Sequence, residues 1–407
     1  SREINRLVEK GIANNPNLQS LQATLKEAEE TLRATEGSLL FPSFNLALGG
    51  ARQRFANSTI GGTGTDIFNL FNTSVNVSYV FDVFGGNHRQ LEATAAAVDY
   101  AHYTMEGAYL SLTANIVTTA MAVASFDKQI RLTDELIHLS EKQLQIMNEQ
   151  FQLGGVSQSD ILSQQNALAA LRAQKPPLQK NWFMARHALA VLVGDLPSES
   201  QLPVLHLQAI HLPHRLPVSV PSRLVRVRPD IQAQEALLHQ ASANIGVATA
   251  NLFPQVSLNS GYGWAATVAN QLLSHTAATW SVGAAIAQPL FNGGALLATK
   301  RAKVAAFESA YALYRQTVLQ AFGNVADSLR ALETDARYLR TQEEAEQATK
   351  QIWQLTQKQY QLGGVSELAV LASAIQYRQA MLNRVQIEAL RYNDTVALFQ
   401  AVGGGLH

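Results

Sequence analysis

The sequence Phe151-Gln-Leu-Gly-Gly-Val-Ser157 occurs a second time, with one change, as Tyr360-Gln-Leu-Gly-Gly-Val-Ser366. The offset between Gly154 and Gly363 is 209 residues, about half of the 407-residue chain. Phe-Pro, Gly-Gly and Ala-Leu pairs recur in the same order with nearly the same offset, at Phe41 and Phe253, Gly85 and Gly293, and Ala188 and Ala397. A unit of this length is far longer than the repeats of solenoid proteins. The chain is therefore predicted to be a duplicated domain.

The two copies are expected to cover residues 1–196 and 221–407, joined by residues 197–220. The joining segment is rich in proline, which is typical of an extended linker. Each copy reads as a helix, a β-hairpin and a long helical hairpin. In the first copy these are Ile4 to about Glu36, about 43–84 and about 87–194; in the second they are Pro221 to about Asn251, about 255–290 and about 295–404.

The segment after each Phe-Pro pair alternates between apolar and small or polar residues. The apolar positions are Phe44, Leu46 and Leu48; Val75, Val77, Tyr79 and Phe81; Val256, Leu258, Tyr262 and Trp264; and Trp280, Val282, Ala284 and Ile286. A period of two residues indicates β-strands with one apolar face. The sequence thus predicts four strands of roughly ten residues, arranged as two hairpins with tips at residues 56–69 and 265–278.

Two stretches without proline, residues 87–152 and 295–361, follow the hairpins. A helix over the first stretch would span about 99 Å. Apolar residues repeat there every seven positions in two parallel series, which predicts contacts with neighbouring helices on both sides. The series are Ile130, Ile137, Leu144 and Phe151, and Leu132, Leu139, Ile146 and Leu153. The return helices are expected to end at Gly194 and Gly403, and the first is expected to be interrupted at Pro176-Pro177.

Composition excludes several classes of function. Lys plus Arg and Asp plus Glu both number 31, so the net charge is zero, which argues against nucleic acid as a partner. Only 15% of residues are charged, against the usual ~25%, so much of the surface should be covered by partners or lipid. Without any cysteine, disulfides and thiolate metal sites are ruled out. No phosphate-binding loop, histidine–carboxylate metal motif or nucleophile elbow is present, so an enzyme is not expected.

A membrane span, if there is one, is expected to use strands. No signal peptide is visible at Ser1, so any targeting segment is expected to have been removed. No run of about 18 apolar residues was found for a transmembrane helix. Open sheet edges are not tolerated in lipid, so several chains would have to pool their strands. Two chains give a filled eight-stranded barrel and three give twelve strands with an open lumen; the alternative is a β-sandwich outside the membrane.

Longer motifs carry a resemblance to a known family over nearly the whole chain. They are Val220-Pro-Ser-Arg-Leu, Arg228-Pro-Asp-Ile231, Ala243-Asn-Ile-Gly-Val-Ala248, Leu252-Phe-Pro254, Gln288-Pro-Leu-Phe-Asn-Gly-Gly294, Tyr314-Arg-Gln-Thr-Val-Leu-Gln-Ala-Phe322 and Ala401-Val-Gly-Gly-Gly405. The chain resembles the TolC superfamily of outer-membrane efflux proteins, in the branch of NodT/OprM-like lipoproteins that serves RND-type multidrug pumps. The resemblance implies a homotrimer in the outer membrane of a Gram-negative bacterium, with a twelve-stranded β-barrel and an α-barrel tunnel in the periplasm. It also implies a periplasmic adaptor (membrane fusion) protein and an inner-membrane RND-type pump as partners.

The two Gly-Gly-Val-Ser turns are the candidate docking tips. By resemblance, Gly154, Gly155, Val156 and Ser157, with Gly363, Gly364, Val365 and Ser366, would meet the adaptor; the alternative is a simple tight turn between helices. Asp160 and Tyr360 are candidates for a periplasmic gate, although Asp160 is equally compatible with a solvated helix charge. The second copy carries Ala369 and Ala372 where relatives have carboxylates, and Val365 where some have arginine. A double acidic ring is therefore not expected.

The aromatic residues Tyr79, Phe81, Tyr262, Trp264 and Trp280 are predicted to form a girdle at the membrane interface. His206, His211 and His214 cluster in the linker and raise the question of a metal site. No nearby carboxylate completes such a site, so a surface loop is favoured, and no metal or cofactor is expected.

These observations predict the exit duct of a tripartite efflux pump, which conducts drugs or other small molecules outward by gated passive passage. The alternatives are a duct for type I secretion or metal-ion efflux, and a soluble coiled-coil scaffold. The scaffold accounts for the apolar heptads but not for the four alternating strands. Relatives of this branch often carry an acylated N-terminal cysteine, which this sequence lacks, so either that end was removed or the anchor is absent.

Overall fold

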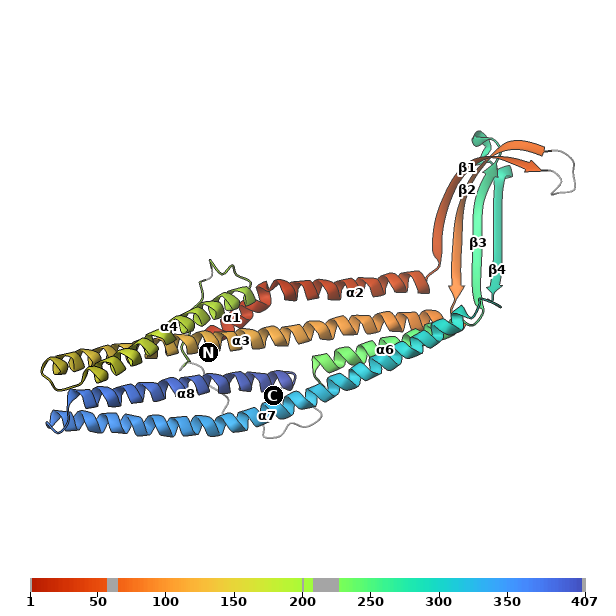
Figure 1. The fold of residues 1–407 in the computed structure, drawn as a ribbon. Coiled ribbons are helices and arrows are strands. Elements are labelled where there is room, and N and C mark those ends of the chain that lie inside the picture. The colour runs from red at the N-terminus through yellow and green to blue at the C-terminus, as the bar shows by residue number, and fades with distance from the viewer. Residues whose placement is uncertain (1, 57–64, 200, 208–226, 405–407) are drawn as a thin grey trace. The chain divides into compact units, whose positions relative to one another are not determined.

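Long helices alternate with two pairs of strands in the computed structural model of the protein, which describes residues 2–56, 65–199, 201–207 and 227–404 (Figure 1). The first half contains α1 (Arg2–Asn14), α2 (Pro16–Leu40), β1 (Ser43–Ala56), β2 (Thr65–Phe81), α3 (Gly86–Gln152) and α4 (Gln158–Leu192). The second half contains α6 (Pro229–Ala250), β3 (Gln255–Ala266), the short 3₁₀ helices η3 (Ala269–Gln271) and η4 (His275–Ala277), β4 (Ala278–Ala287), α7 (Ala295–Gln361) and α8 (Glu367–Ala401). The prediction of a mainly helical chain with four strands is confirmed.

The chain divides into two compact units, and each is built from segments far apart in the sequence. The helical unit comprises Ser1–Gln22, Thr104–Ile231 and Thr317–His407. The sheet unit comprises Ala23–Tyr103 and Gln232–Gln316. Both halves of the sequence contribute to both units, so neither compact unit corresponds to one of the two sequence repeats. The repeat boundaries themselves stay a prediction.

The sheet unit contains one antiparallel sheet with the strand order β1-β2-β3-β4. Leu46 lies opposite Val75, Val75 opposite Tyr262, and Tyr262 opposite Trp280. Residues directly opposite each other share a face of a sheet. These four residues therefore form one row across all four strands.

The two faces of this sheet differ in chemistry, as the alternation predicts. The apolar face carries Phe44, Leu46, Leu48, Val75, Val77, Tyr79, Phe81, Val256, Leu258, Tyr262, Trp264, Trp280, Val282 and Ile286. Where all four strands are paired, the other face, here called the small polar face, carries mainly Ser, Asn and Gly, with Val80 as an exception. These residues are Ser43, Asn45, Asn72, Ser74, Asn76, Ser78, Ser257, Asn259, Gly261, Gly263, Ser281 and Gly283. Ser43 Oγ and Ser78 Oγ lie 2.7 Å apart on the second face. Both faces are largely exposed in the single chain.

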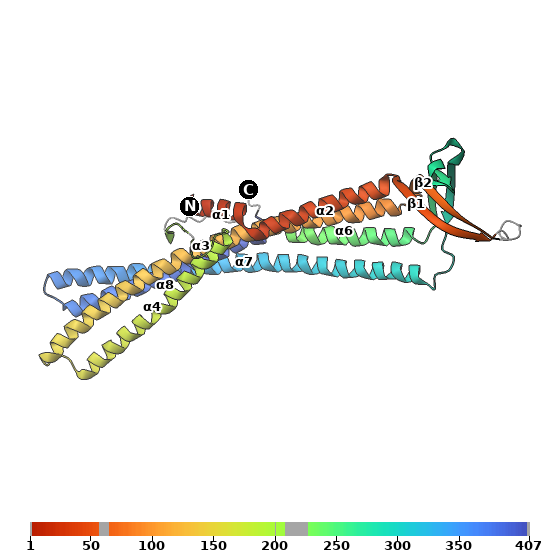
Figure 2. The same ribbon diagram turned by 90° about the horizontal axis from the view of Figure 1, so that it is seen from above.

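The first hairpin is longer than expected, with 14 residues in β1 and 17 in β2. Ala56 pairs with Thr65, so the prediction that residues 65–69 belong to the hairpin tip was wrong. Polar residues such as Asn69 suggested a loop, but a two-stranded ribbon open on both sides accepts polar side chains. Residues 65–70 of β2 pair only with β1, so the tip end of this hairpin extends past β3 (Figure 2).

The first helix is divided at Asn15, whereas a single helix from Ile4 to Glu36 was predicted. The Asn15 side chain accepts hydrogen bonds from the backbone N–H groups of Asn17 (3.0 Å) and Leu18 (3.2 Å). Its amide also donates to the Leu192 carbonyl at 3.0 Å. Pro16 explains the break, because the residue before a proline avoids the helical conformation.

The long helices agree closely with the proline-free stretches. α3 and α7 have 67 residues each and begin and end within one residue of the predicted limits. In the helical unit, α4 returns antiparallel to α3 and α8 returns antiparallel to α7 (Figures 1 and 2). Gly194 (φ +80°) and Gly403 (φ +77°) follow the ends of the return helices, as predicted. Positive φ at this position lets the chain leave a helix without strain.

One helix among the described residues is apolar enough, by length and composition, to cross a membrane. An 18-residue window of α3 has a mean hydropathy of 1.3, and 44% of it is buried inside the protein. No such window was expected from the sequence. A single helix of this kind is weak evidence for a span, because helices in a protein core pass the same test.

Helix α4 continues through Pro176 and Pro177, so the predicted interruption was wrong. Both prolines are exposed, as are Arg172 and Ala173, whose carbonyl oxygens lose their helical partners. Water can satisfy carbonyls at such a surface. Two ion pairs also hold the preceding turn against α3, from Arg172 Nη2 to Glu141 (2.7 Å) and from Lys175 Nζ to Asp134 (2.6 Å).

The core of the helical unit lies where α1, α3, α4 and α8 meet. Its most buried side chains include Ile116, Leu132, Leu136, Leu189 and Val193. The linker contributes Leu205 and Leu207, each 5% exposed. This part of the linker is therefore packed into the core, which its proline-rich composition did not predict.

Candidate functional site

The two Gly-Gly-Val-Ser turns have the same backbone conformation. Gly154 and Gly363 adopt φ values of +76° and +77°. The next glycine N–H closes each turn: Gly155 donates to the Gln150 carbonyl at 2.7 Å, and Gly364 to the Gln359 carbonyl at 2.8 Å. These contacts satisfy carbonyls left open at the ends of α3 and α7. The structure thus explains the two glycines of each turn by the turn conformation, and the docking role of these residues stays a prediction.

Asp160 takes part in a capping box at the start of α4. Its Oδ2 atom accepts hydrogen bonds from Ser157 N (3.0 Å) and Ser157 Oγ (2.7 Å), and Asp160 N donates to Ser157 Oγ at 3.2 Å. The hydrogen bonds from Ser157 lower the pKa of Asp160. At the second turn Ser366 Oγ accepts from Ala369 N at 3.4 Å, and alanine cannot return the bond. The Ser-x-x-Asp spacing at 157–160 is a readable signal for this cap.

Tyr360 lies at the end of α7 close to an ion pair that the sequence did not suggest. Lys142 Nζ on α3 lies 2.8 Å from Glu367 Oε1, at the first residue of α8. The hydrogen bond and charge of Glu367, with a smaller contribution from Tyr360, raise the pKa of Lys142. This pair joins the two helical hairpins near the second turn. No local sequence pattern could pair two residues so far apart.

Further contacts join α3 to α8 at positions farther from the second turn than this ion pair. Arg378 Nε lies 2.5 Å from Glu135 Oε2, and Gln386 donates to Gln129 Oε1 at 3.3 Å. Arg378 also lies over the ring of Tyr377, with its Cζ atom 5.1 Å from the ring centroid. The interface between α3 and α8 thus contains several polar contacts along its length, and Lys142–Glu367 is the one nearest the second turn.

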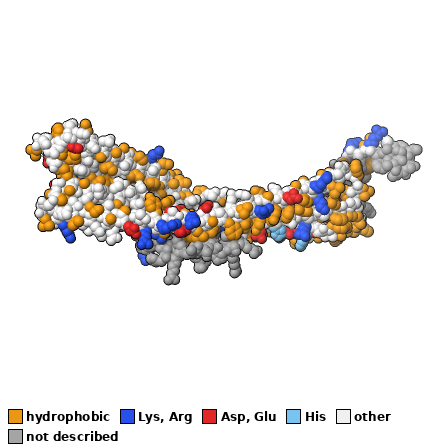
Figure 3. Space-filling view, turned by 60° about the horizontal axis from the view of Figure 1, so that its bottom comes forward, with side chains coloured by type: hydrophobic (Ala, Val, Ile, Leu, Met, Phe, Trp, Pro, Cys, Tyr) orange, Lys and Arg blue, Asp and Glu red, His pale blue; other side chains and the backbone are white. Residues whose placement is uncertain are grey.

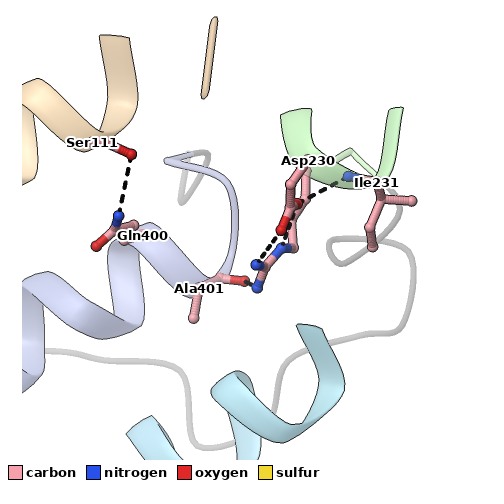
Figure 4. A network of polar contacts seen from close by, with 6 residues as sticks. Ser111, Asp230, Ile231, Gln400 and Ala401 are labelled. Atoms are coloured by element: carbon pink, nitrogen blue, oxygen red, sulfur yellow. Dashed lines mark hydrogen bonds and ion pairs between the residues drawn. The ribbon is translucent and has the colours of Figure 1, made fainter. Parts of the chain in front are cut away.

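Arg228 ties the end of α8 to the start of α6 in the helical unit. Figure 4 shows two of its partners, Ala401 and Asp230. Its Nη1 atom donates to the Ala401 carbonyl at 2.8 Å. Nε and Nη2 donate to the Asp230 carboxylate at 3.0 and 2.7 Å. Nearby, Gln400 donates to Ser111 Oγ on α3 at 3.5 Å. Arg228 is 7% exposed, so this anchor is almost fully buried.

The predicted interface aromatics all lie on the apolar face of the sheet, at two levels. Tyr262 lies opposite Trp280, and Trp264 lies opposite Thr73 in the next row. Tyr79 and Phe81 lie nearer the helices, with their rings in edge-to-face contact at 5.1 Å. Trp280 is 76% exposed in the single chain. One face thus suits lipid, and the opposite face of small polar side chains suits water.

The histidine cluster is described only in part. His206 is exposed between the buried residues Leu205 and Leu207. His211 and His214 lie outside the described residues.

Comparison with known proteins agrees with this architecture. Residues 7–195 and 220–404 match the family model described as "Outer membrane efflux protein". The pyoverdine export outer membrane protein OpmQ of Pseudomonas putida is 27% identical over 415 residues, covering 100% of this chain and 86% of that protein. Outer membrane protein OprJ of Pseudomonas aeruginosa is 26% identical over 410 residues, covering 99% of this chain and 84% of that protein.

A solved structure shows the same fold. The outer-membrane channel OprN superimposes with a TM-score of 0.91 at 26% identity, covering 100% of this chain and 91% of that chain. The resemblance to the TolC superfamily is therefore confirmed, and so are the predictions of an exit channel rather than an enzyme and of an outer-membrane location. Channels of this kind work within tripartite efflux pumps. From the match over both halves of its sequence, the chain belongs to the outer membrane efflux protein family.

Proposed function

We propose that three copies of this chain form a closed exit duct that receives small organic molecules from a periplasmic adaptor and an inner-membrane RND-type pump. The duct itself supplies no energy, and passage is passive once the periplasmic mouth opens. Relatives are named for pyoverdine export and toluene efflux, which supports small organic cargo.

The open four-stranded sheet carries this proposal. β1 and β4 are its outer strands, and within the described residues neither has a partner on its outer side. Unpaired backbone groups are very unfavourable in lipid. Pairing β4 of one copy with β1 of the next removes every edge, and three copies give twelve strands, enough for an open lumen. The small polar face would line that lumen, because its Gly, Ser and Asn side chains leave the most space.

The surface of the single chain also fits assembly. Figure 3 shows a face on which apolar side chains are widespread, while Lys, Arg, Asp and Glu side chains gather mainly over its middle part and near one end. Several large apolar residues along α7 are exposed, including Tyr311, Leu313, Leu319 and Phe322. Exposed large apolar side chains on a helix are typical of surfaces that contact another protein.

The assembly is tested by the conductance of the detergent-purified protein in a planar lipid bilayer, with its mass measured in parallel. We expect discrete channel steps from a particle of three 44.3 kDa chains. A monomer that never inserts into the bilayer would rule out the duct.

The mouth is proposed to close through links between helices, with Lys142–Glu367 and Tyr360 at the second turn and Asp160 at the first. Reversing one charge, in Lys142→Glu or Glu367→Lys, replaces attraction by repulsion and should raise conductance. The double reversal restores opposite charges and should return conductance toward the wild-type value. Lys350→Glu, at an exposed lysine of α7, is the matched control. Equal conductance in all variants would remove this pair from the gate.

Asp160 needs a separate test, because its capping role alone could explain it. Asp160→Ala and Ser157→Ala both break the capping box, but only the first removes a charge. A rise in conductance in Asp160→Ala alone would support a gate charge. The same rise in both variants would assign Asp160 to the turn only.

The docking role of the two turns is tested by efflux in cells. Val156→Asp and Val365→Asp place a charge on each half-buried turn residue. If the turns meet the adaptor, efflux should fall while bilayer conductance of the purified channel persists. Efflux at the wild-type level in the double variant would place the docking surface elsewhere.

A further inference from the structure

Only three charged residues occur in the four strands, and two of them are arginines at the far end of the first hairpin. The three are Arg52, Arg54 and Asp66. The β1 strand starts after α2 at Ser43, so Arg52 and Arg54 lie toward the end of the hairpin away from the helices. Both arginine side chains are exposed.

The register places both arginines on the apolar face of the sheet. Side chains two positions apart on a strand share a face. Arg52 and Arg54 therefore continue the series Phe44, Leu46 and Leu48. Asp66 belongs to the opposite face, because its neighbours in β2 at odd positions carry the apolar series. Among the described strand residues, the apolar face carries no acidic side chain.

The position of the arginines matches the outer boundary of an apolar band. Arg52 lies opposite Asn69, and Phe81 marks the end of β2 nearest the helices. From Phe81 to Asn69 the strand rises about 40 Å, which is about 30 Å along a barrel axis at a tilt near 40°. The apolar band of outer-membrane barrels is about 25 Å tall. Arg52 then lies a few ångströms outside the hydrocarbon, where lipid headgroups are.

Polar groups beside the arginines favour an anion. Arg54 Nη2 donates to Thr65 Oγ1 at 3.3 Å, which holds the guanidinium over the same face of the hairpin. The Asn69 amide opposite Arg52 adds a donor on that face. Arginine binds phosphate through two parallel N–H groups and is the preferred side chain for this purpose.

We propose that Arg52 and Arg54 bind the phosphate groups of a phosphorylated glycolipid in the outer leaflet of the membrane. The proposal rests on the orientation in the proposed function, with the helices on the periplasmic side. Continuity with the lipid-facing surface selects a lipid over a dissolved anion, because the acyl chains would lie against Leu48 and Leu46 below the arginines. Basic residues at a membrane surface bind anionic headgroups in this way.

The test uses the detergent-purified full chain and native mass spectrometry. Bisphosphorylated lipid A, the same lipid with its phosphates removed, and inorganic phosphate are titrated separately. We expect the first to bind, the second to bind much more weakly, and inorganic phosphate to compete poorly. The double variant Arg52→Gln/Arg54→Gln should lose about 25-fold in affinity, at roughly fivefold for each arginine. Arg330→Gln/Arg337→Gln, at two exposed arginines of α7, is the matched control and should bind like the wild type.

Three results would overturn the proposal: equal binding of the lipid without phosphates, unchanged affinity of the double variant, or inorganic phosphate binding as tightly as the lipid. The comparison of the two lipids uses wild-type protein only, so it holds even if the variant fails to assemble. Conductance of the same preparations separates this proposal from the duct. Channel activity without a phosphate preference would remove the lipid site alone, and a phosphate preference without channel activity would remove the duct alone.

Discussion

Single side chains fix the ends of several helices, and Arg228 is the most buried of those that carry a charge. Replacing Arg228 by Ala removes its bond to the Ala401 carbonyl and its two bonds to Asp230. We expect the free energy of unfolding to fall by about 1.5–3 kcal/mol, because hydrogen bonds to a buried charged group are lost. Denaturant unfolding followed by circular dichroism measures this. Arg33→Ala breaks an exposed ion pair with Glu30 and should change stability by less than about 1 kcal/mol; equal effects would contradict the assignment.

The two serine caps provide a matched pair. Ser157 exchanges hydrogen bonds with Asp160, whereas Ser366 accepts one longer bond from Ala369. Ser157→Ala should therefore lower the free energy of unfolding by about 1 kcal/mol, and Ser366→Ala by less. Thermal unfolding of both variants decides between this order and its reverse.

At this scale the sequence predicted positions better than roles. Gly154, Gly363 and Asp160 were identified as candidate site residues. The spacing of Ser157 and Asp160 is also the signal of a capping box. The partner of Lys142 was not predictable, because Glu367 comes near it only through the packing of α3 against α8. Local patterns carry no information about such a contact.

At the scale of elements, α4 shows that packing can override a helix breaker. Replacing both Pro176 and Pro177 by Ala should raise the free energy of unfolding by about 2–4 kcal/mol, because two helical hydrogen bonds return. Gln179→Ala, at an exposed residue of the same helix, is the control and should have little effect. If the double replacement is neutral or destabilising, the prolines are required by a neighbour of α4.

The contact between α7 and α8 predicts a dependence on pH. Asp335 is 6% exposed. Burial, followed by the hydrogen bond and charge of Asp394, raises the pKa of Asp335 to about 6, against a smaller opposing effect of Arg391. The folded state thus holds this proton more tightly than the unfolded state, so stability is greatest below about pH 4 for this group and is lost as pH rises toward 6.

Asp335→Asn should remove this dependence. The variant should have a higher melting temperature than the wild type above pH 6, because it has no buried charge at this position. The wild type should lose stability between about pH 4 and 6 relative to the variant. Melting curves at a series of pH values measure this, with the exposed Asp327→Asn as control. Parallel curves for wild type and Asp335→Asn would contradict it.

The elements themselves were largely predictable. Proline-free length located α3 and α7, and the period of two located the four strands. Two failures concern local signals that the rest of the fold outweighs: Pro176-Pro177 did not stop a helix, and Asn69 did not end a strand. The opposite failure occurred at Asn15, where a local signal was stronger than the helical pattern around it.

At the scale of the whole molecule, the prediction concerns closure of the sheet between copies. The chain has no cysteine, so a thiol reagent can react only with cysteines that are introduced by mutation. Ala47→Cys on β1 combined with Ala285→Cys on β4 places one thiol on each outer strand. A flexible bis-maleimide should link copies into dimers and trimers and no further, because a ring of three closes. Each single variant is the control and should give no trimer; a ladder beyond trimers would contradict a closed ring.

The sheet also sets an order of events during folding. Phe81 pairs with Val256 and Phe71 with Ala266, so β2 must wait for a partner encoded in the other half of the chain. The first hairpin, α3 and α4 are synthesised before β3. During that time β2 is paired with β1 on one side and has no strand on the other. Contacts between such distant residues make folding slow and leave strand edges open to aggregation. The inner edge of the first hairpin therefore stays unpaired until residues 255–266 have been made, and over that interval the hairpin is exposed to association with other copies of the chain.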